Sequence, residues 1–246
     1  MIVDHASVDL PTPTGPMRCH LHKPVADGRW PGVVLFSEIF QHTGPVARTA
    51  TMLAGHGFVV AVPEIFHELE PAGAVLSYDQ GGADAGNRHK VSKTVAAYDA
   101  AARAALDHLA SRDDCTGALA TMGVCIGGHL AFRCAFDARV RAAACFYATD
   151  LHKGTLGAGG DDSLARAGEI GGELMMVWGR GDPHVPHDGR RRIEARLVET
   201  GRRFTWHEHE AVHAFLRDEG PRYDPALALT SYRMVVDLFL RNAVRA

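Results

Sequence analysis

The sequence predicts an α/β protein with a mainly parallel central sheet and helices on both of its faces. Short apolar runs typical of buried strands alternate along the chain with longer segments of helical spacing. The 246 residues, of which 46% are hydrophobic, are enough for the core of one domain of ordinary size. Since no repeat, low-complexity tract or linker interrupts this alternation, we expect a single domain over residues 1–246.

The first elements are expected to form an antiparallel pair at the edge of the sheet. Val3–Leu10 and Met17–His22 flank a turn that contains proline and glycine. Pro31–Phe36 then has the pattern of a buried strand. A helical segment that ends in glycine follows over Gly44–Gly57, and Phe58–Pro63 is the next expected strand.

The stretch over residues 63–87 has no clear period and is long for a connection within a compact domain. We therefore expect a lid or substrate loop there. Helical spacing returns over Val91–Ala110, before the strand that leads to Cys125. Further alternation predicts helix Gly128–Asp137, strand Ala142–Tyr147, strand Leu174–Trp178, helix Gly189–Thr200, strand Arg203–His207 and helix Pro225–Arg241.

Composition and charge exclude several classes of function. The five cysteines are scattered and odd in number, which favours reduced thiols in the cytoplasm over a disulfide framework. The start of the chain does not resemble a signal peptide, and no run has the length of a membrane span. With a formal net charge of −3 we expect no nucleic-acid partner, and we read the Arg190–Arg192 cluster as a solvated helix face.

Gly123–Gly128 reads Gly-Val-Cys-Ile-Gly-Gly and lies between an apolar run and an Ala-rich helical segment. This pattern is typical of a nucleophile elbow, with Cys125 in place of serine. Small neighbours let a tight strand-to-helix turn present one side chain above the sheet. The Ile126 N–H would then supply half of an oxyanion hole. The alternative is a glycine-rich turn around a buried core cysteine.

Asp182 and His213 each follow an expected strand, as Cys125 does. Ligands of parallel sheets bind at the carboxyl ends of the strands. The order nucleophile, acid, base is also the chain order of α/β-hydrolase triads. His213 would take the thiol proton and Asp182 would orient its ring, although Asp182 before a proline is also a common turn residue.

Most of the chain resembles the dienelactone hydrolase family of α/β-hydrolases. Four patches carry the resemblance, and their order is more specific than any one of them: Phe36–Phe40, Gly123–Gly128, Trp178–Pro186 and Ala211–Phe215.

The resemblance implies a triad of Cys125, His213 and Asp182 that opens lactones or esters through a thioester. It also implies that Glu38 takes part in activating the thiol and that the N–H of Ile39 completes the oxyanion hole.

Family members hold the substrate carboxylate with arginines, whose forked guanidinium matches two carboxylate oxygens. Arg217 matches one of these arginines, and Arg88 lies in the right part of the chain for the other. Tyr147, after a predicted strand, either lines the pocket or caps a core strand.

Two segments depart from the family pattern, residues 64–87 and residues 217–224, and they put dienelactone itself in doubt. We therefore expect hydrolysis of a small carboxylate-bearing lactone or activated ester. We expect no metal or other cofactor, a small molecule as the partner, and a monomer or small homo-oligomer.

The sequence also bears on three alternative functions. A glutamine amidotransferase is disfavoured because no His-x-Glu pair follows the elbow. A non-catalytic relative that keeps the fold for binding is disfavoured by the presence of all four candidate catalytic residues. A metal-dependent hydrolase would draw its ligands from a set of histidines, namely His184, His187, His207, His209 and His213.

Overall fold

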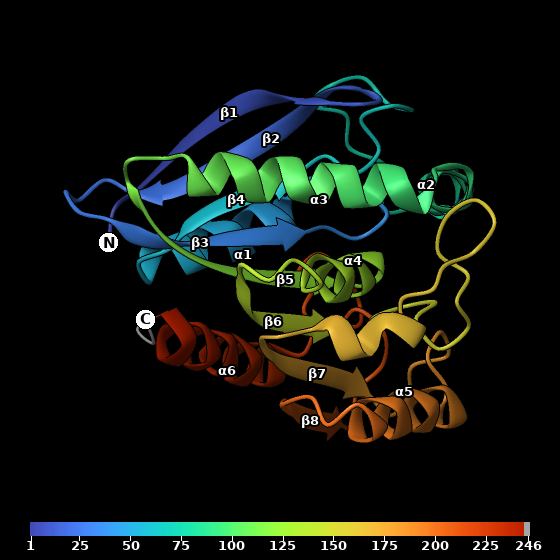
Figure 1. The fold of residues 1–246 in the computed structure, drawn as a ribbon. Helices are drawn as coiled ribbons and strands as arrows, with labels where there is room; N and C mark the ends of the chain where they lie inside the picture. The colour runs from blue at the N-terminus through green and yellow to red at the C-terminus, as the bar shows by residue number, and fades with distance from the viewer. Residues whose placement is uncertain (244–246) are drawn as a thin grey trace.

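In a computed structural model of the protein, which describes residues 1–243, one eight-stranded sheet runs through the molecule (Figure 1). The strand order is β1-β2-β4-β3-β5-β6-β7-β8. Strands β1 and β2 are antiparallel to their neighbours, and the remaining six are parallel. The α/β fold class and the antiparallel edge are therefore confirmed. The strands are β1 Val3–Thr12, β2 Gly15–Pro24, β3 Trp30–Phe36, β4 Val59–Pro63, β5 Cys115–Val124, β6 Val140–Phe146, β7 Glu173–Gly179 and β8 Phe204–His209.

Helices cover both faces of this sheet (Figure 1), and each face has its own apolar core. Helices α3, α4 and α5 pack on one face, and α1 and α6 pack on the other. The helices are α1 Gly44–Gly55, α2 Gln80–Ser92, α3 Val95–Ala110, α4 Ile126–Cys134, α5 His187–Glu199 and α6 Pro225–Ala243, with a short 3₁₀ helix over Ala165–Glu169.

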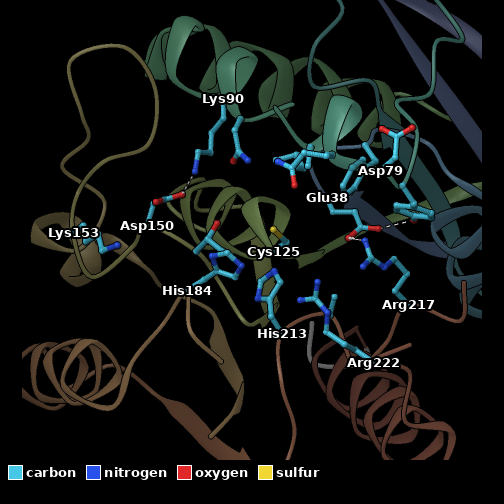
Figure 2. Close-up of a pocket in the computed structure, with 18 residues that line it drawn as sticks. Glu38, Asp79, Lys90, Cys125, Asp150, Lys153, His184, His213, Arg217 and Arg222 are labelled. Carbon is cyan, nitrogen blue, oxygen red and sulfur yellow. Dashed lines mark hydrogen bonds and ion pairs between the residues drawn. The ribbon is translucent and has the colours of Figure 1, made fainter. Parts of the chain in front are cut away.

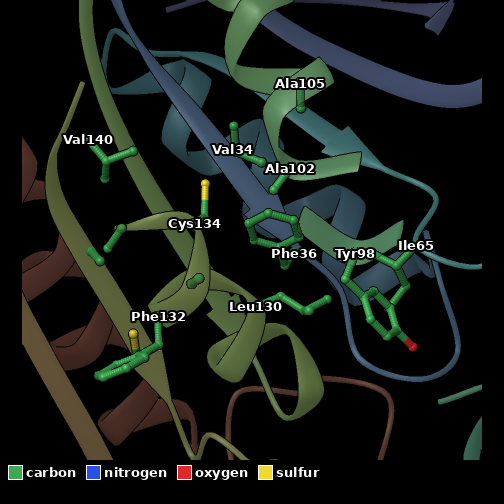
Figure 3. Packing of buried hydrophobic residues seen from close by; sticks show 14 of the residues in the cluster. Val34, Phe36, Ile65, Tyr98, Ala102, Ala105, Leu130, Phe132, Cys134 and Val140 are labelled. Carbon is green, nitrogen blue, oxygen red and sulfur yellow. The ribbon is translucent and has the colours of Figure 1, made fainter. Parts of the chain in front are cut away.

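The first core shows how the sheet supports the elbow (Figure 3). Phe36 of β3 and Leu130 of α4 are buried together with Tyr98 of α3. Helix α4 is buried along its whole length, which agrees with its many small and apolar residues. The turn that begins α4 is thus held against the middle strands of the sheet.

The expectation of an irregular segment over residues 63–87 is corrected in its second half, where α2 begins at Gln80. Three glycines lower the helical propensity of this stretch. Tertiary packing compensates for them: a Cβ on Gly86 would lie 2.6 Å from the Ile39 carbonyl oxygen, so only glycine allows so close an approach. Asp79 also caps the helix, because its side chain accepts from the Gly82 N–H at 2.8 Å.

The expected helix over Val91–Ala110 is two helices. Lys93 has extended backbone angles and ends α2. Thr94 then caps α3 by accepting from the Ala97 N–H at 3.2 Å. The other expected elements are present, with boundaries that differ by a few residues.

The register of the parallel strands determines which loops meet. Phe36 lies opposite Gly123, and Val124 lies opposite Phe146. The segments that follow β3, β5 and β6 therefore leave the sheet side by side, and those after β7 and β8 leave along the same edge. Within residues 1–243, no helix combines the length and apolar character needed to cross a bilayer.

Candidate active site

Cys125 sits in the tight turn between β5 and α4, with a φ of 60°. Such a conformation is strained for a residue with a side chain. Neighbouring glycines make the turn possible: a Cβ on Gly123 would collide with the Gly127 carbonyl, and one on Gly127 with the Phe36 carbonyl. The elbow geometry expected from the sequence is therefore the geometry found.

His213 and Asp182 meet beside this turn, in the loops after β8 and β7. His213 Nδ1 lies 2.7 Å from Asp182 Oδ2, and both side chains are buried. The other carboxylate oxygen of Asp182 accepts from the His184 N–H at 2.8 Å. Each oxygen of Asp182 thus has one donor, and the imidazole is fixed with its Nδ1 turned away from Cys125.

The charges in this group favour an imidazolium. Burial works against the charge on His213, but the nearby Cys125 sulfur and the hydrogen bond to Asp182 raise the pKa of His213 to about 10. Burial likewise works against the charge on Asp182, yet the hydrogen bond from His213 lowers its pKa overall. The arrangement is suited to an imidazolium that the Asp182 carboxylate holds beside the Cys125 sulfur.

Glu38 and Arg217 lie on the other side of Cys125 (Figure 2). Glu38 is 4% exposed, and the Tyr78 hydroxyl donates to its Oε1 at 2.6 Å. Arg217 Nη1 lies 3.6 Å from Glu38 Oε2, and its guanidinium lies over the Tyr78 ring. Burial raises the pKa of Glu38, against the opposing effects of Arg217 and Tyr78.

These groups open onto one cavity of about 420 Å³. Figure 2 shows cationic side chains at both of its ends, with Arg217 and Arg222 at one and Lys90 and Lys153 at the other. Cys125 lies between them. A cavity of this size suits a small molecule.

Two backbone N–H groups are the candidates for an oxyanion hole, those of Ile126 and Ile39. Ile126 is the first residue of α4, so its N–H belongs to the donors that a helix leaves unpaired at its N-terminus. Ile39 lines the cavity directly after Glu38. These are the two positions that the sequence singled out for an oxyanion hole.

Two expected substrate contacts lie elsewhere. Arg88 is exposed on α2 and is not among the residues that line the cavity. Helical spacing explains this, because Ala83, Asn87 and Lys90 share the inward face and Arg88 is turned away from it. Tyr147 is buried behind the site, with its ring 5.0 Å from that of His213. It does not line the main cavity, but it lines a small second pocket together with Glu38 and Arg217.

The cavity also contains residues that the sequence did not single out, including an ion pair across it. Lys90 of α2 donates to Asp150 Oδ2 at 2.8 Å, which links α2 to the segment after β6. Residue types alone gave no signal for this pair, because the two positions are far apart in sequence. The sequence did not single out Tyr78 either, because its partner Glu38 lies 40 positions earlier in the chain. Five residues of the 63–87 stretch line this cavity, namely Tyr78, Asp79, Gln80, Ala83 and Asn87.

The histidines considered as metal ligands do not converge. Among residues 1–243, no group of three or more histidine, cysteine or acidic side chains is arranged to hold a metal ion. His184 lies in the cavity with its ring 4.6 Å from that of His213. His207 and His209 lie on β8, and His187 is at the exposed start of α5.

All five cysteines are free, and four of them are enclosed in the core. Burial raises the pKa of Cys19 and Cys134 to about 12. Cys125 differs because its side chain lines the cavity.

Comparison with known proteins agrees with this geometry. The sequence model of the dienelactone hydrolase family matches residues 17–243. A putative carboxymethylenebutenolidase of Saccharomyces cerevisiae is 37% identical over 98% of this chain and 93% of its own length. A carboxymethylenebutenolidase of Pseudomonas sp. strain P51 is 26% identical over 98% of this chain and 96% of its own length.

Solved structures show the same fold. A putative dienelactone hydrolase from Klebsiella pneumoniae superposes with a TM-score of 0.79 at 20% identity, over 98% of this chain and all of its own. A dienelactone hydrolase-like promiscuous phosphotriesterase from metagenomic libraries gives the same score at 22% identity, over 98% of this chain and 99% of its own.

Proposed function

The chain belongs to the dienelactone hydrolase family, and from this premise we propose that it hydrolyses small carboxylate-bearing lactones or activated esters with Cys125 as the nucleophile. One observation carries the proposal. The imidazole of His213 is held between Asp182 and the Cys125 sulfur, at an elbow that opens into a cavity. This is the arrangement that nucleophilic catalysis by a thiol requires.

In the first half of the reaction, the Cys125 thiolate attacks the carbonyl carbon of the substrate. The negative charge moves to the carbonyl oxygen, where the N–H groups of Ile126 and Ile39 stabilise it. When the tetrahedral intermediate collapses, the bond to the leaving oxygen breaks and the His213 imidazolium donates its Nε2 proton to that oxygen. The products are a thioester and a free hydroxyl, which stay in one molecule when the substrate is a lactone.

The second half releases the acid. His213, now neutral, removes a proton from a water molecule, and the resulting hydroxide attacks the thioester carbonyl. The C–S bond breaks, the carboxylic acid leaves, and the thiolate and imidazolium are restored. Asp182 keeps the same nitrogen of His213 directed at the reacting atoms throughout.

Glu38 provides a second acceptor for the thiol proton. A carboxylate is normally too weak a base to take the proton of a thiol. Burial raises the pKa of Glu38, however, and so brings it closer to the pKa of a thiol. Arg217 would hold the substrate carboxylate, because its guanidinium faces the cavity and lies 3.6 Å from Glu38 rather than in a close fork with it.

The test compares wild type with Cys125→Ala on p-nitrophenyl acetate and on a carboxylated enol-lactone. We expect the variant to fold normally and to lose turnover of both compounds. Cys134→Ala is the matched control, because Cys134 lies on the same elbow helix but faces the core. A folded Cys125→Ala variant that retains turnover would refute the proposal.

A further inference from the structure

Tyr78 contacts two charged side chains of the site, Glu38 and Arg217. We propose that Tyr78 is a positioning residue that holds Glu38 in its ionised state through its hydroxyl and holds Arg217 ready for a substrate carboxylate through its ring. The inference rests on the proposed function and assigns a role within the same site.

The hydroxyl of Tyr78 makes the shortest hydrogen bond to Glu38. It donates to Oε1 at 2.6 Å, whereas the nearest cationic atom, Arg217 Nη1, is 3.6 Å from Oε2. The Glu38 side chain is almost fully buried. A buried carboxylate depends on such donors to remain charged, so the loss of this hydrogen bond should raise the pKa of Glu38 further.

The ring of Tyr78 has a separate partner. The guanidinium carbon of Arg217 lies 4.4 Å from the centroid of the Tyr78 ring and 5.7 Å from that of Phe40. The two rings pack edge-on, with their centroids 4.8 Å apart. Arg217 Nε is buried and has no hydrogen-bond acceptor among residues 1–243. Stacking rather than a close carboxylate fork therefore fixes the guanidinium, and its terminal nitrogens stay available for a ligand.

Tyr78 is itself held firmly. Its hydroxyl lies 2.7 Å from Thr43 Oγ1, and it directly precedes the helix cap Asp79. The surrounding loops are joined by two further bonds, from the Leu76 N–H to the Phe40 carbonyl and from Gln41 Nε2 to the Ala74 carbonyl. The phenol is thus attached to the same loop that carries Glu38 and Ile39.

The state of Glu38 depends on every charged group that faces it. Burial raises its pKa, and Arg217, the Tyr78 hydrogen bond, His213 and Arg222 all act in the opposite direction. Burial and the charge of Glu38 raise the pKa of Tyr78 well above its usual value, so the phenol remains a donor at any working pH. Removing the hydroxyl should leave Glu38 protonated up to a higher pH.

Two substitutions separate the two contacts. Tyr78→Phe removes the hydroxyl and keeps the ring, so the acidic limb of the kcat/KM profile should move to a pH about one to two units higher. Its preference for a carboxylated over a neutral ester should stay within about threefold of wild type. Tyr78→Leu also removes the ring, and that preference should fall by about 5- to 10-fold.

Tyr232→Phe is the matched control, because Tyr232 is also a largely buried tyrosine with a hydroxyl partner, Thr49 at 3.1 Å, but does not line the cavity. Its pH profile should match that of wild type. If Tyr78→Phe lowers kcat/KM equally at every pH while Cys125→Ala is inactive, the role of Tyr78 is refuted and the proposed function stands. An active, folded Cys125→Ala variant would overturn both.

Discussion

Asp182→Asn is the substitution for which the structure gives the sharpest expectation. The two oxygens of Asp182 accept from different donors, His213 Nδ1 at 2.7 Å and the His184 N–H at 2.8 Å. An asparagine has only one oxygen, so it can satisfy only one of them. If that oxygen faces His184, the amide NH₂ faces His213 and favours the tautomer that carries its proton on Nε2. That tautomer cannot accept a proton from Cys125 or water.

The size of the effect follows from these contacts. A hydrogen bond to a charged group contributes about 1.5–3 kcal/mol, which corresponds to roughly a 10- to 150-fold loss of rate. The tautomer change adds to it, and in serine-type triads the equivalent substitution costs about 10⁴-fold. We therefore expect kcat/KM to fall by about 10²- to 10⁴-fold.

The assay is hydrolysis of p-nitrophenyl acetate, with circular dichroism and thermal unfolding to establish that the variant folds. Asp188→Asn is the control, since Asp188 is a fully exposed acid nearby that lies only against the exposed His187. A folded Asp182→Asn enzyme within threefold of wild type would show that Asp182 does not orient His213. The acid role would then pass to Glu38.

Further predictions concern stability, specificity and metal dependence. Gly127→Ala should lower stability by about 2–3 kcal/mol, roughly 5–10 °C in Tm, because its Cβ would collide with the Phe36 carbonyl; Gly171→Ala, with open space around it, should change Tm little. Arg217→Met should lower the preference for a carboxylated over a neutral ester by about 10- to 100-fold in kcat/KM, and an unchanged preference would remove Arg217 from carboxylate binding. Burial opposes the charge on Glu173, but hydrogen bonds from neighbouring arginine and asparagine side chains lower its pKa. Because the lowered pKa stabilises the folded protein above the usual value of 4.5, Glu173→Gln should lower the free energy of unfolding by about 1–2 kcal/mol at pH 7. The deficit should shrink steadily as the pH falls below about 4.5, and a deficit that does not change with pH would contradict this. Treatment with EDTA should leave turnover intact, and a loss restored by added zinc would favour the metal-dependent alternative.

The fold was predictable because its signals are local. The buried strands and the antiparallel edge are visible as apolar runs and turn residues. Helix α2 was not predictable, because its three glycines are compensated only by contacts such as the packing of Gly86 on Ile39. Intrinsic propensity cannot report a contact between segments that are distant in the chain.

Some residues of the site were predictable from the sequence, and others were not. Cys125, Asp182 and His213 follow strand ends, and the register of a parallel sheet brings such positions together. Tyr78 and Lys90 belong to a segment whose path over the sheet edge is determined by tertiary contacts, so their place in the cavity could not be derived from spacing.

The enclosure of four cysteines in the core makes thiol labelling a measure of correct folding. A thiol-directed alkylating reagent reaches Cys125 through the cavity, whereas Cys19 and Cys145 are completely inaccessible to solvent. A folded chain should therefore take up about one equivalent of label at Cys125, whereas a chain that has lost its fold exposes all five thiols and takes up more. The number of equivalents taken up per chain thus reports the folded fraction of a preparation before its turnover is measured.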